Sequence, residues 1–322
     1  MNINQLGFDC ICKLNSLGFY MASVRDTIKE MEFTKIEEHA FVIDALKYIN
    51  KLLPKCKVPV MPIGEFVFVT ICSNRELDLA KASITSFVLN SKIHPKEYII
   101  VSDGTWNLKD GEEFFHNFVS PLKLISWEDC VASISEMYPE MVAWSQKQIW
   151  GRKLATIISF SMNSRVLFSD SDVLWFKTPF NYKELLEIKL KLSVDNDYFY
   201  DNKCIKSLGL EGIYTKFPPI NCGVVFISDF NNIITPIARE CMKYEAESPG
   251  NFSEQTFFAI LNMKYKSVWT SEQIRVDISD MISDFAETSD ITNDIIARHY
   301  VWRLKWIFWK DYITMRLSTP NT

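Results

Sequence analysis

Short apolar runs alternate along this chain with longer stretches in which apolar residues recur every three or four positions. The short runs are rich in β-branched and aromatic residues, which is typical of β-strands. They cover residues 65–73, 97–104, 122–126, 165–169, 190–197, 218–228 and 266–270. Strands that alternate with helices predict an α/β fold with a mixed, mostly parallel sheet flanked by crossover helices.

Helical spacing is clear near the N-terminus. Val42, Ala45, Ile49 and Leu53 recur at intervals of three and four residues, and Pro54 ends the run. We therefore predict that residues 1–57 form an N-terminal helical extension.

Further helices are predicted over about 77–88, 145–162 and 252–262, the last with Ser253 as its N-terminal cap. No repeat, low-complexity tract or flexible linker interrupts the chain after residue 57. A single main domain is therefore predicted over residues 58–322.

Composition narrows the function classes. The formal net charge of -5 over 322 residues gives no reason to expect a nucleic-acid partner. Eight cysteines occur without a CxxC pair, and several lie within apolar runs. We expect free thiols, a reducing compartment and a cytoplasmic location. The N-terminus lacks the features of a signal peptide, and no uninterrupted apolar stretch is long enough to span a membrane.

Polar residues follow several of the predicted strands. Cys72, Asn74 and Asp103 lie at the ends of the first two, where ligands bind in parallel sheets. The stretch RVLFSDSDVLWFKTP ends its first apolar run in Asp170 and Asp172. At about 5 Å and an effective dielectric of about 20, their repulsion is roughly 3 kcal/mol. A divalent cation such as Mn²⁺ or Mg²⁺ would turn this repulsion into attraction.

An acidic turn that merely faces solvent is the alternative for this D-x-D pair. Such pairs also occur by chance, and Asp195 and Asp197 form a second one in this chain. The apolar runs on both sides of Asp170 and Asp172, together with a basic predicted helix before them, favour a cation-binding loop.

The D-x-D stretch resembles the metal-binding segment of GT-A fold glycosyltransferases, in particular the glycogenin and bacterial galactosyltransferase group. Other segments resemble that family in the same order along roughly residues 64–310. They are FVFVTICSN, WGRKLATI, INCGVVFIS, FSEQTFFAI and HYVWRLKW. Two departures occur: Glu254 stands where the family has Asp, and Trp302 stands where its last motif has Gly.

The resemblance implies a set of site residues. Asp170, Asp172 and His299 would bind Mn²⁺ or Mg²⁺. The donor would contact residues on several segments: Thr70, Cys72, Asn74, Asp103, Arg152, Lys153, Asp170 and Lys305.

A further group would lie at the reacting centre, namely Asp195, Asn221, Glu254 and Lys305. Lys305 would neutralise the leaving diphosphate. Each has an ordinary structural alternative, such as a turn, a helix cap, a solvated helix face or a lysine lying over tryptophan rings.

The implied activity is metal-dependent transfer of a sugar from a nucleotide diphosphate sugar, a UDP-sugar, to an acceptor hydroxyl with retention of configuration. The alternatives are a haloacid-dehalogenase-type phosphatase that uses the same D-x-D and a non-catalytic sugar- or nucleotide-binding module. The Trp-rich segment at about 297–318 is predicted to form a lid over the donor. Core packing and peripheral membrane contact are the alternatives for this segment.

Overall fold

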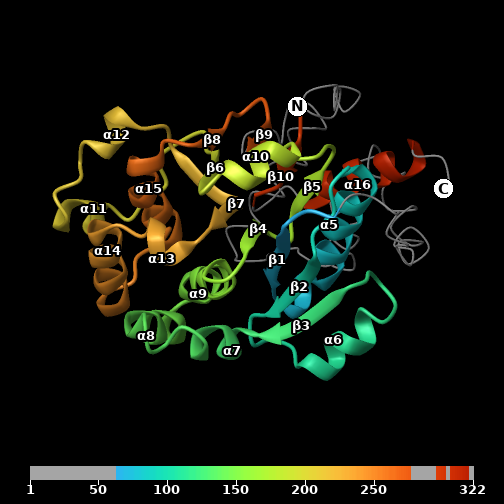
Figure 1. The fold of residues 1–322 in the computed structure, drawn as a ribbon, viewed down its shortest axis with the longest axis horizontal. Coiled ribbons are helices and arrows are strands. Elements are labelled where there is room, and N and C mark those ends of the chain that lie inside the picture. The colour runs from blue at the N-terminus through green and yellow to red at the C-terminus, as the bar shows by residue number, and fades with distance from the viewer. Residues whose placement is uncertain (1–62, 277–294, 302–304, 319–322) are drawn as a thin grey trace, which may run out of the picture.

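The computed structural model describes residues 63–276, 295–301 and 305–318 (Figure 1). The predicted N-terminal extension and Trp302 lie outside these residues. The strands are β1 (Phe66–Cys72), β2 (Glu97–Ser102), β3 (Leu122–Ser126), β4 (Arg165–Ser169), β5 (Val173–Trp175), β6 (Leu190–Val194), β7 (Ile220–Ser228), β8 (Val268–Trp269), β9 (Ile274–Val276) and β10 (Ala297–His299).

The helices connect and cover these strands. They are η2 (Asn74–Glu76), α5 (Leu77–Asn90), α6 (Leu108–Phe114), α7 (Trp127–Ala132), α8 (Pro139–Lys147), α9 (Ile149–Ser161), α10 (Tyr182–Glu187), α11 (Asn202–Ser207), α12 (Ile213–Lys216), α13 (Phe230–Ile233), α14 (Pro236–Glu247), α15 (Ser253–Tyr265) and α16 (Lys305–Ser318). In the described part of the chain, no helix combines the length and apolar character that crossing a bilayer requires.

A seven-stranded sheet forms the centre, in the order β3-β2-β1-β4-β7-β6-β8. The β3-β2-β1-β4 pairs and the β6-β8 pair are parallel, whereas β7 runs antiparallel to both β4 and β6. The predicted mixed, mostly parallel sheet flanked by helices is therefore confirmed. Because β7 runs against its neighbours, its first residues meet the carboxyl ends of β4 and β6.

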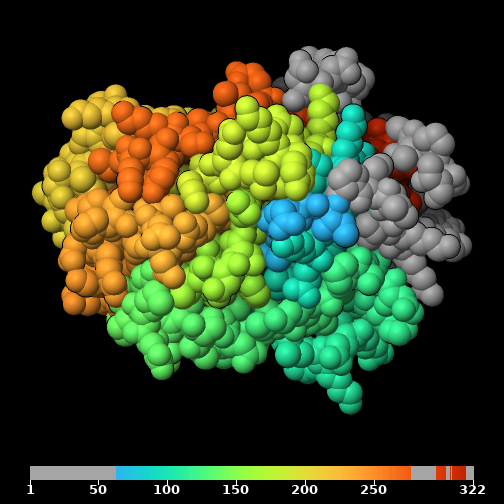
Figure 2. Space-filling view, viewed as in Figure 1, coloured from blue at the N-terminus to red at the C-terminus, as the bar shows by residue number. Residues whose placement is uncertain are grey.

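Two apolar cores cover the two faces of this sheet, because successive strand residues point to opposite sides. On β1, Val67 and Val69 face a core that includes residues of α8, α9, α14 and α15. Phe66 and Phe68 face a second core with residues of α5, β5, β9 and β10. Helices α11, α12, α14 and α15 form one end of the molecule, seen in yellow and orange, and α6 lies toward the other (Figures 1 and 2).

A second sheet lies beside the first and has the order β5-β10-β9. Strand β10 pairs antiparallel with β5 and places His299 opposite Val173. Because β5 follows β4 after a short turn, this pairing brings the C-terminal segment next to Asp170 and Asp172.

Two helix boundaries differ from the sequence prediction. The predicted helix over 145–162 is divided, because Gln148 has an extended backbone between α8 and α9. The predicted Ser253 cap of α15 is wrong. Phe252 occupies the cap position with a positive φ of 60°, and the Ser253 hydroxyl donates instead to Gln148 Oε1 at 3.0 Å. A hydroxyl in a favourable sequence position does not cap a helix when a tertiary partner holds it.

A buried ion pair holds α16 on the small sheet. Arg298 Nη1 lies 3.1 Å from Asp311 Oδ2, and the Tyr300 hydroxyl donates to the same oxygen at 2.5 Å. On the same helix, the side chains of Phe308, Trp309 and Tyr312 are fully buried. Core packing therefore accounts for these aromatic residues of the C-terminal segment.

We expect Asp311→Ala to lower the free energy of unfolding by about 3–5 kcal/mol, because it leaves Arg298 charged and buried without this carboxylate. Urea unfolding of the purified protein would measure the change. The control is Glu240→Ala, which breaks an ion pair between half-exposed side chains, Lys243 and Glu240. Its effect should stay within about 0.5 kcal/mol. Equal effects of the two variants would contradict a stabilising role for the buried pair.

Candidate metal and donor site

The turn that carries Asp170 and Asp172 connects β4 of the large sheet to β5 of the small one. Two backbone hydrogen bonds fix it from opposite sides. The Asp170 N–H donates to the Gly223 carbonyl at 2.7 Å, and the Tyr300 N–H donates to the Asp172 carbonyl at 3.0 Å. The turn is therefore held by β7 on one side and by the end of β10 on the other.

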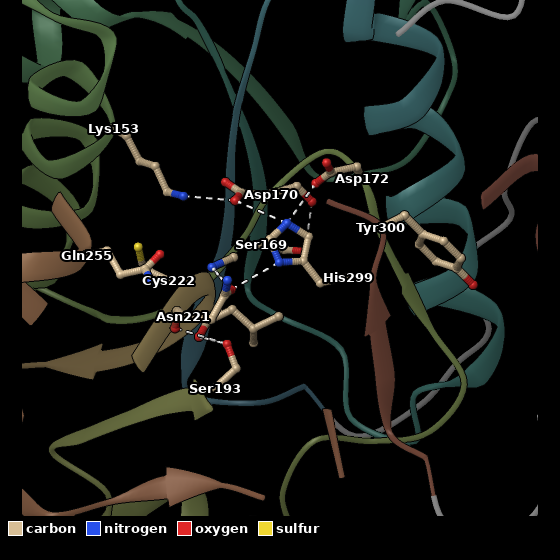
Figure 3. Close-up of polar contacts among 12 residues, drawn as sticks. Lys153, Ser169, Asp170, Asp172, Ser193, Asn221, Cys222, Gln255, His299 and Tyr300 are labelled. Atoms are coloured by element: carbon tan, nitrogen blue, oxygen red, sulfur yellow. Dashed lines mark hydrogen bonds and ion pairs between the residues drawn. The ribbon is translucent and has the colours of Figure 1, made fainter. Parts of the chain in front are cut away.

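Three candidate ligands converge at this turn. His299 Nε2 lies 3.2 Å from Asp172 Oδ1 and 3.6 Å from Asp170 Oδ2. One ligand atom from each of the three side chains lies within 4.8 Å of the other two. The imidazole lies between the two carboxylates and Asn221, which Figure 3 shows. Two carboxylates and one imidazole could hold a divalent cation.

Hydrogen bonds assign the protonated nitrogen of the His299 ring. Asn221 Nδ2 donates to Asp195 Oδ2 at 3.0 Å, so its Oδ1 is the acceptor that faces the Gly223 N–H at 2.8 Å. The same Oδ1 lies 3.0 Å from His299 Nδ1, which must therefore carry the proton. The lone pair is then on Nε2 and faces the two carboxylates, as a metal ligand requires.

Burial keeps this imidazole neutral. Loss of solvent lowers the pKa of His299 to about 4, although the Asp170 carboxylate opposes part of this shift. The ring is therefore unprotonated at neutral pH, which is the form that binds a metal ion.

Glycine at position 223 is required by the close approach of the ring. A Cβ atom built on Gly223 would overlap Nδ1 and Cε1 of His299. The first residues of β7 thus contribute twice: Asn221 orients the imidazole, and Gly223 leaves room for it.

Two lysines flank the carboxylates. Lys153 on α9 donates to Asp170 Oδ2 at 2.8 Å and lies 3.8 Å from Glu254 Oε1. Burial would lower the pKa of Lys153, but the negative charge of Asp170, aided by Glu254, raises it overall. Lys305, the first residue of α16, contacts Asp172 Oδ2 and donates to the Tyr300 carbonyl at 2.9 Å. Burial lowers the pKa of Lys305 to about 8.

Residues of β6 and α15 extend the site beyond Asn221. Asp195 follows β6 and accepts from both Asn221 and Gln255, the latter at 3.3 Å. Burial raises the pKa of Asp195. Glu254 is buried, and its Oε2 has no hydrogen-bond partner within the described ranges. Burial raises the pKa of Glu254, whereas Lys153 opposes the shift.

Gln255 was missed as a site residue by the sequence reasoning. It follows Glu254 directly, and Glu-Gln stands where the resembling family has Asp-Gln. That pair was the signal that could have identified it.

The other predicted donor residues lie in or just after β1 and β2, apart from Arg152 on α9. Arg152 is held away from the carboxylates: it donates to the Asp103 carbonyl at 2.5 Å and lies over the Trp127 ring at 4.3 Å. The Asp103 carboxylate accepts from Thr105. Three further predicted residues differ in exposure, since Thr70 and Cys72 are buried in β1 whereas Asn74 is exposed.

No model of a known protein family matches this chain, and a search of curated proteins finds no match. Solved structures are similar at low identity. The chain is 12% identical to a galactosyltransferase, LgtC, in complex with donor and acceptor sugar analogues, over 80% of this chain and 97% of that one, with a TM-score of 0.45. Mouse xyloside xylosyltransferase 1 is 11% identical, over 73% of this chain and 96% of that one, with a TM-score of 0.43.

The mannosyltransferase Ktr4p from S. cerevisiae is 10% identical, over 70% of this chain and 76% of that one, with a TM-score of 0.39. These structures are glycosyltransferases, as the sequence resemblance leads us to expect. The TM-scores all lie below 0.5.

We expect Gly223→Ala to weaken Mn²⁺ binding by at least about 10-fold, because the added methyl group displaces the His299 ring from the carboxylates. Electron paramagnetic resonance of free Mn²⁺ would measure the affinity without an activity assay. Gly212→Ala is the control, since its Cβ would meet only the Lys216 side chain at 3.7 Å. Unchanged Mn²⁺ affinity in a folded Gly223→Ala protein would show that His299 is not a ligand.

Proposed function

We propose that this protein is a metal-dependent glycosyltransferase that moves a sugar from a UDP-sugar to an acceptor hydroxyl. The observation that carries the proposal is the convergence of Asp170, Asp172 and His299 beside two buried lysines. This cluster lies at the carboxyl end of β4. The strand order changes direction between β1 and β4, which is where ligands bind in open α/β sheets.

The donor set fits Mn²⁺ or Mg²⁺. Asp170 and Asp172 supply carboxylate oxygens, and the Nδ1-protonated ring of His299 supplies one nitrogen. When bound, the cation would act as a Lewis acid that stabilises charge on the diphosphate leaving group.

The lysines would complete the diphosphate site. Lys305 contacts Asp172, so a phosphate group held beside that carboxylate comes within reach of the ammonium group. Lys153 lies between two acids, Asp170 and Glu254, and its positive charge allows both carboxylates to lie close together in a buried position. Both lysines would then stabilise the negative charge that develops on the diphosphate as its bond to the sugar breaks.

Asp195, Asn221, Glu254 and Gln255 would face the sugar that is transferred. Asp195 already accepts two amide hydrogen bonds, and carboxylates and amides are suited to sugar hydroxyls. The transfer would retain the configuration of the anomeric carbon. The bond from the anomeric carbon to the diphosphate breaks, the acceptor oxygen bonds to the same face, and its proton passes to a leaving phosphate oxygen.

Arg152, Asp103, Thr70, Cys72 and Asn74 remain predicted contacts of the nucleotide. Thr70, Cys72, Asn74 and Asp103 lie in or just after β1 and β2, and Arg152 on α9 donates to the Asp103 carbonyl. Peripheral membrane contact by the C-terminal segment likewise stays a prediction.

In the phosphatase alternative, the Asp170 carboxylate would attack the phosphorus atom of a phosphate ester. Its Oδ2 is instead engaged by Lys153, and the neighbouring imidazole is suited to a metal ligand. No observation on the described residues favours that chemistry over sugar transfer, and the preserved ligand cluster gives no support to a non-catalytic module.

We expect UDP to bind the purified protein only when Mn²⁺ is present, because its diphosphate is held through the cation. Isothermal titration with and without Mn²⁺ measures this dependence. Asp172→Ala should weaken UDP binding at least about 100-fold, since it removes a ligand rather than an outer contact. Asp110→Ala, which removes an exposed carboxylate on α6, is the control and should leave the affinity unchanged.

Metal-independent UDP binding, or full affinity in Asp172→Ala, would contradict the proposed site. Binding of GDP in place of UDP would retain the site and change the donor. Hydrolysis of p-nitrophenyl phosphate that is lost in Asp170→Asn, with no nucleotide binding, would favour the phosphatase.

A further inference from the structure

A second cluster of ligand-type side chains lies at the end of the molecule that α11, α12, α14 and α15 form, where α11 packs on α14 (Figure 1). Cys204 on α11 and Cys241 on α14 are fully buried, and their sulfur atoms are 3.6 Å apart. Glu245 follows Cys241 by one helical turn and so lies on the same face of α14. One ligand atom from each of the three side chains lies within 4.8 Å of the other two.

Glu245 lacks a positive partner in this buried position. Its side chain is fully buried, and its Oε2 accepts the Gly250 N–H at 2.9 Å. Its Oε1 has no hydrogen-bond partner within residues 63–276, 295–301 and 305–318, and no described basic side chain forms an ion pair with it. A buried carboxylate is costly unless a proton or a cation neutralises it.

We propose that Cys204, Cys241 and Glu245 form a second metal site that binds a thiophilic cation, Zn²⁺. In a tetrahedral site with Zn–S bonds of about 2.3 Å, two sulfur ligands lie roughly 3.8 Å apart. The observed sulfur separation of 3.6 Å therefore needs little adjustment. Binding forms two Zn–S bonds and one Zn–O bond, and both thiol protons are released to water, which makes affinity pH-dependent.

The carboxylate of Asp201 lies close to this junction, outside the three-residue cluster. It lies three residues before Cys204 and caps α11, and it packs so closely on Gly250 that a Cβ there would overlap it. A water molecule would fill the fourth position of a tetrahedral site.

This site would fasten the loop that carries Asp195. The chain runs from Asp195 at the end of β6 directly to α11, and the Asp201 N–H donates to Thr256 Oγ1 of α15 at 2.6 Å. Glu254 and Gln255 lie on the same helix as Thr256. A cation that joins α11 to α14 thus holds the loop next to the helix that faces the proposed sugar site.

The two proposed sites differ in donor chemistry, so one metal probe separates them. Cobalt(II) bound by thiolates gives an intense near-ultraviolet sulfur-to-metal charge-transfer band, which oxygen and imidazole ligands do not produce. We would titrate Co²⁺ into reduced, metal-free Asp172→Ala protein, in which the first site is impaired. We expect the band to saturate at one equivalent and to disappear when Zn²⁺ is added.

In the same background, Cys204→Ser and Cys241→Ser should each weaken the charge-transfer band by at least about half, because each removes one of the two thiolates. Glu245→Gln keeps the side-chain shape and should weaken Co²⁺ affinity at least about 10-fold. Cys130→Ser is the matched control, because it removes a buried thiol of α7 outside the cluster. Its titration should match that of the parent protein.

Absence of the charge-transfer band from folded Asp172→Ala protein with an intact cysteine cluster would overturn the proposal, even if every cluster variant failed to fold. A band of undiminished intensity in both cysteine variants would also overturn it. So would a Cys204–Cys241 disulfide in protein purified without reductant, found by mass spectrometry of a peptide digest. Zinc that co-purifies at one equivalent with the parent, but not with Cys204→Ser, would support it.

Discussion

Two carboxylates held in one short turn are the constraint on which the rest of the site depends. Asp170 and Asp172 would repel each other in isolation, but Lys153 and Lys305 offset their charges and backbone hydrogen bonds fix both ends of the turn. One of these bonds comes from Gly223 of β7, and the other comes from Tyr300 beside β10. The geometry of the two carboxylates therefore depends on contacts with segments that are far away in the sequence.

The antiparallel direction of β7 explains why its first residues contact several parts of the site. Because it runs antiparallel to β4 and β6, its first residues lie at the edge where the neighbouring strands end. Asn221 can then connect Asp195 to His299, and Gly223 can leave space for the imidazole. A parallel β7 would place these residues at the opposite edge of the sheet, away from the D-x-D turn.

Much of the fold could be predicted because strand and helix periods are local properties. The positions of β1, β2 and β3 and the turn at Asp170 follow from the apolar pattern, although β2 ends at Ser102, two residues before the predicted end. The direction of β7 could not be predicted, because an apolar run has the same pattern in either orientation. The Lys153–Asp170 contact, the tautomer of His299 and the cluster of Cys204 with Cys241 depend on long-range packing. The resemblance to a family supplied His299 and Lys305 as candidates, and no local pattern would have done so.

The charge balance of the site indicates how its ligands would bind under the proposed function. Asp170 and Asp172 are matched by the ammonium groups of Lys153 and Lys305, so the central pairs are close to neutral without any ligand. A divalent cation alone would add positive charge to a buried region, and a diphosphate alone would add negative charge. Each therefore binds less favourably alone than together with the other. When the cation and the diphosphate bind together, their charges offset each other. Lys305 would then contact a phosphate oxygen in place of the Asp172 carboxylate. The cation and the nucleotide therefore favour each other's binding, and by linkage the coupling is equal in both directions.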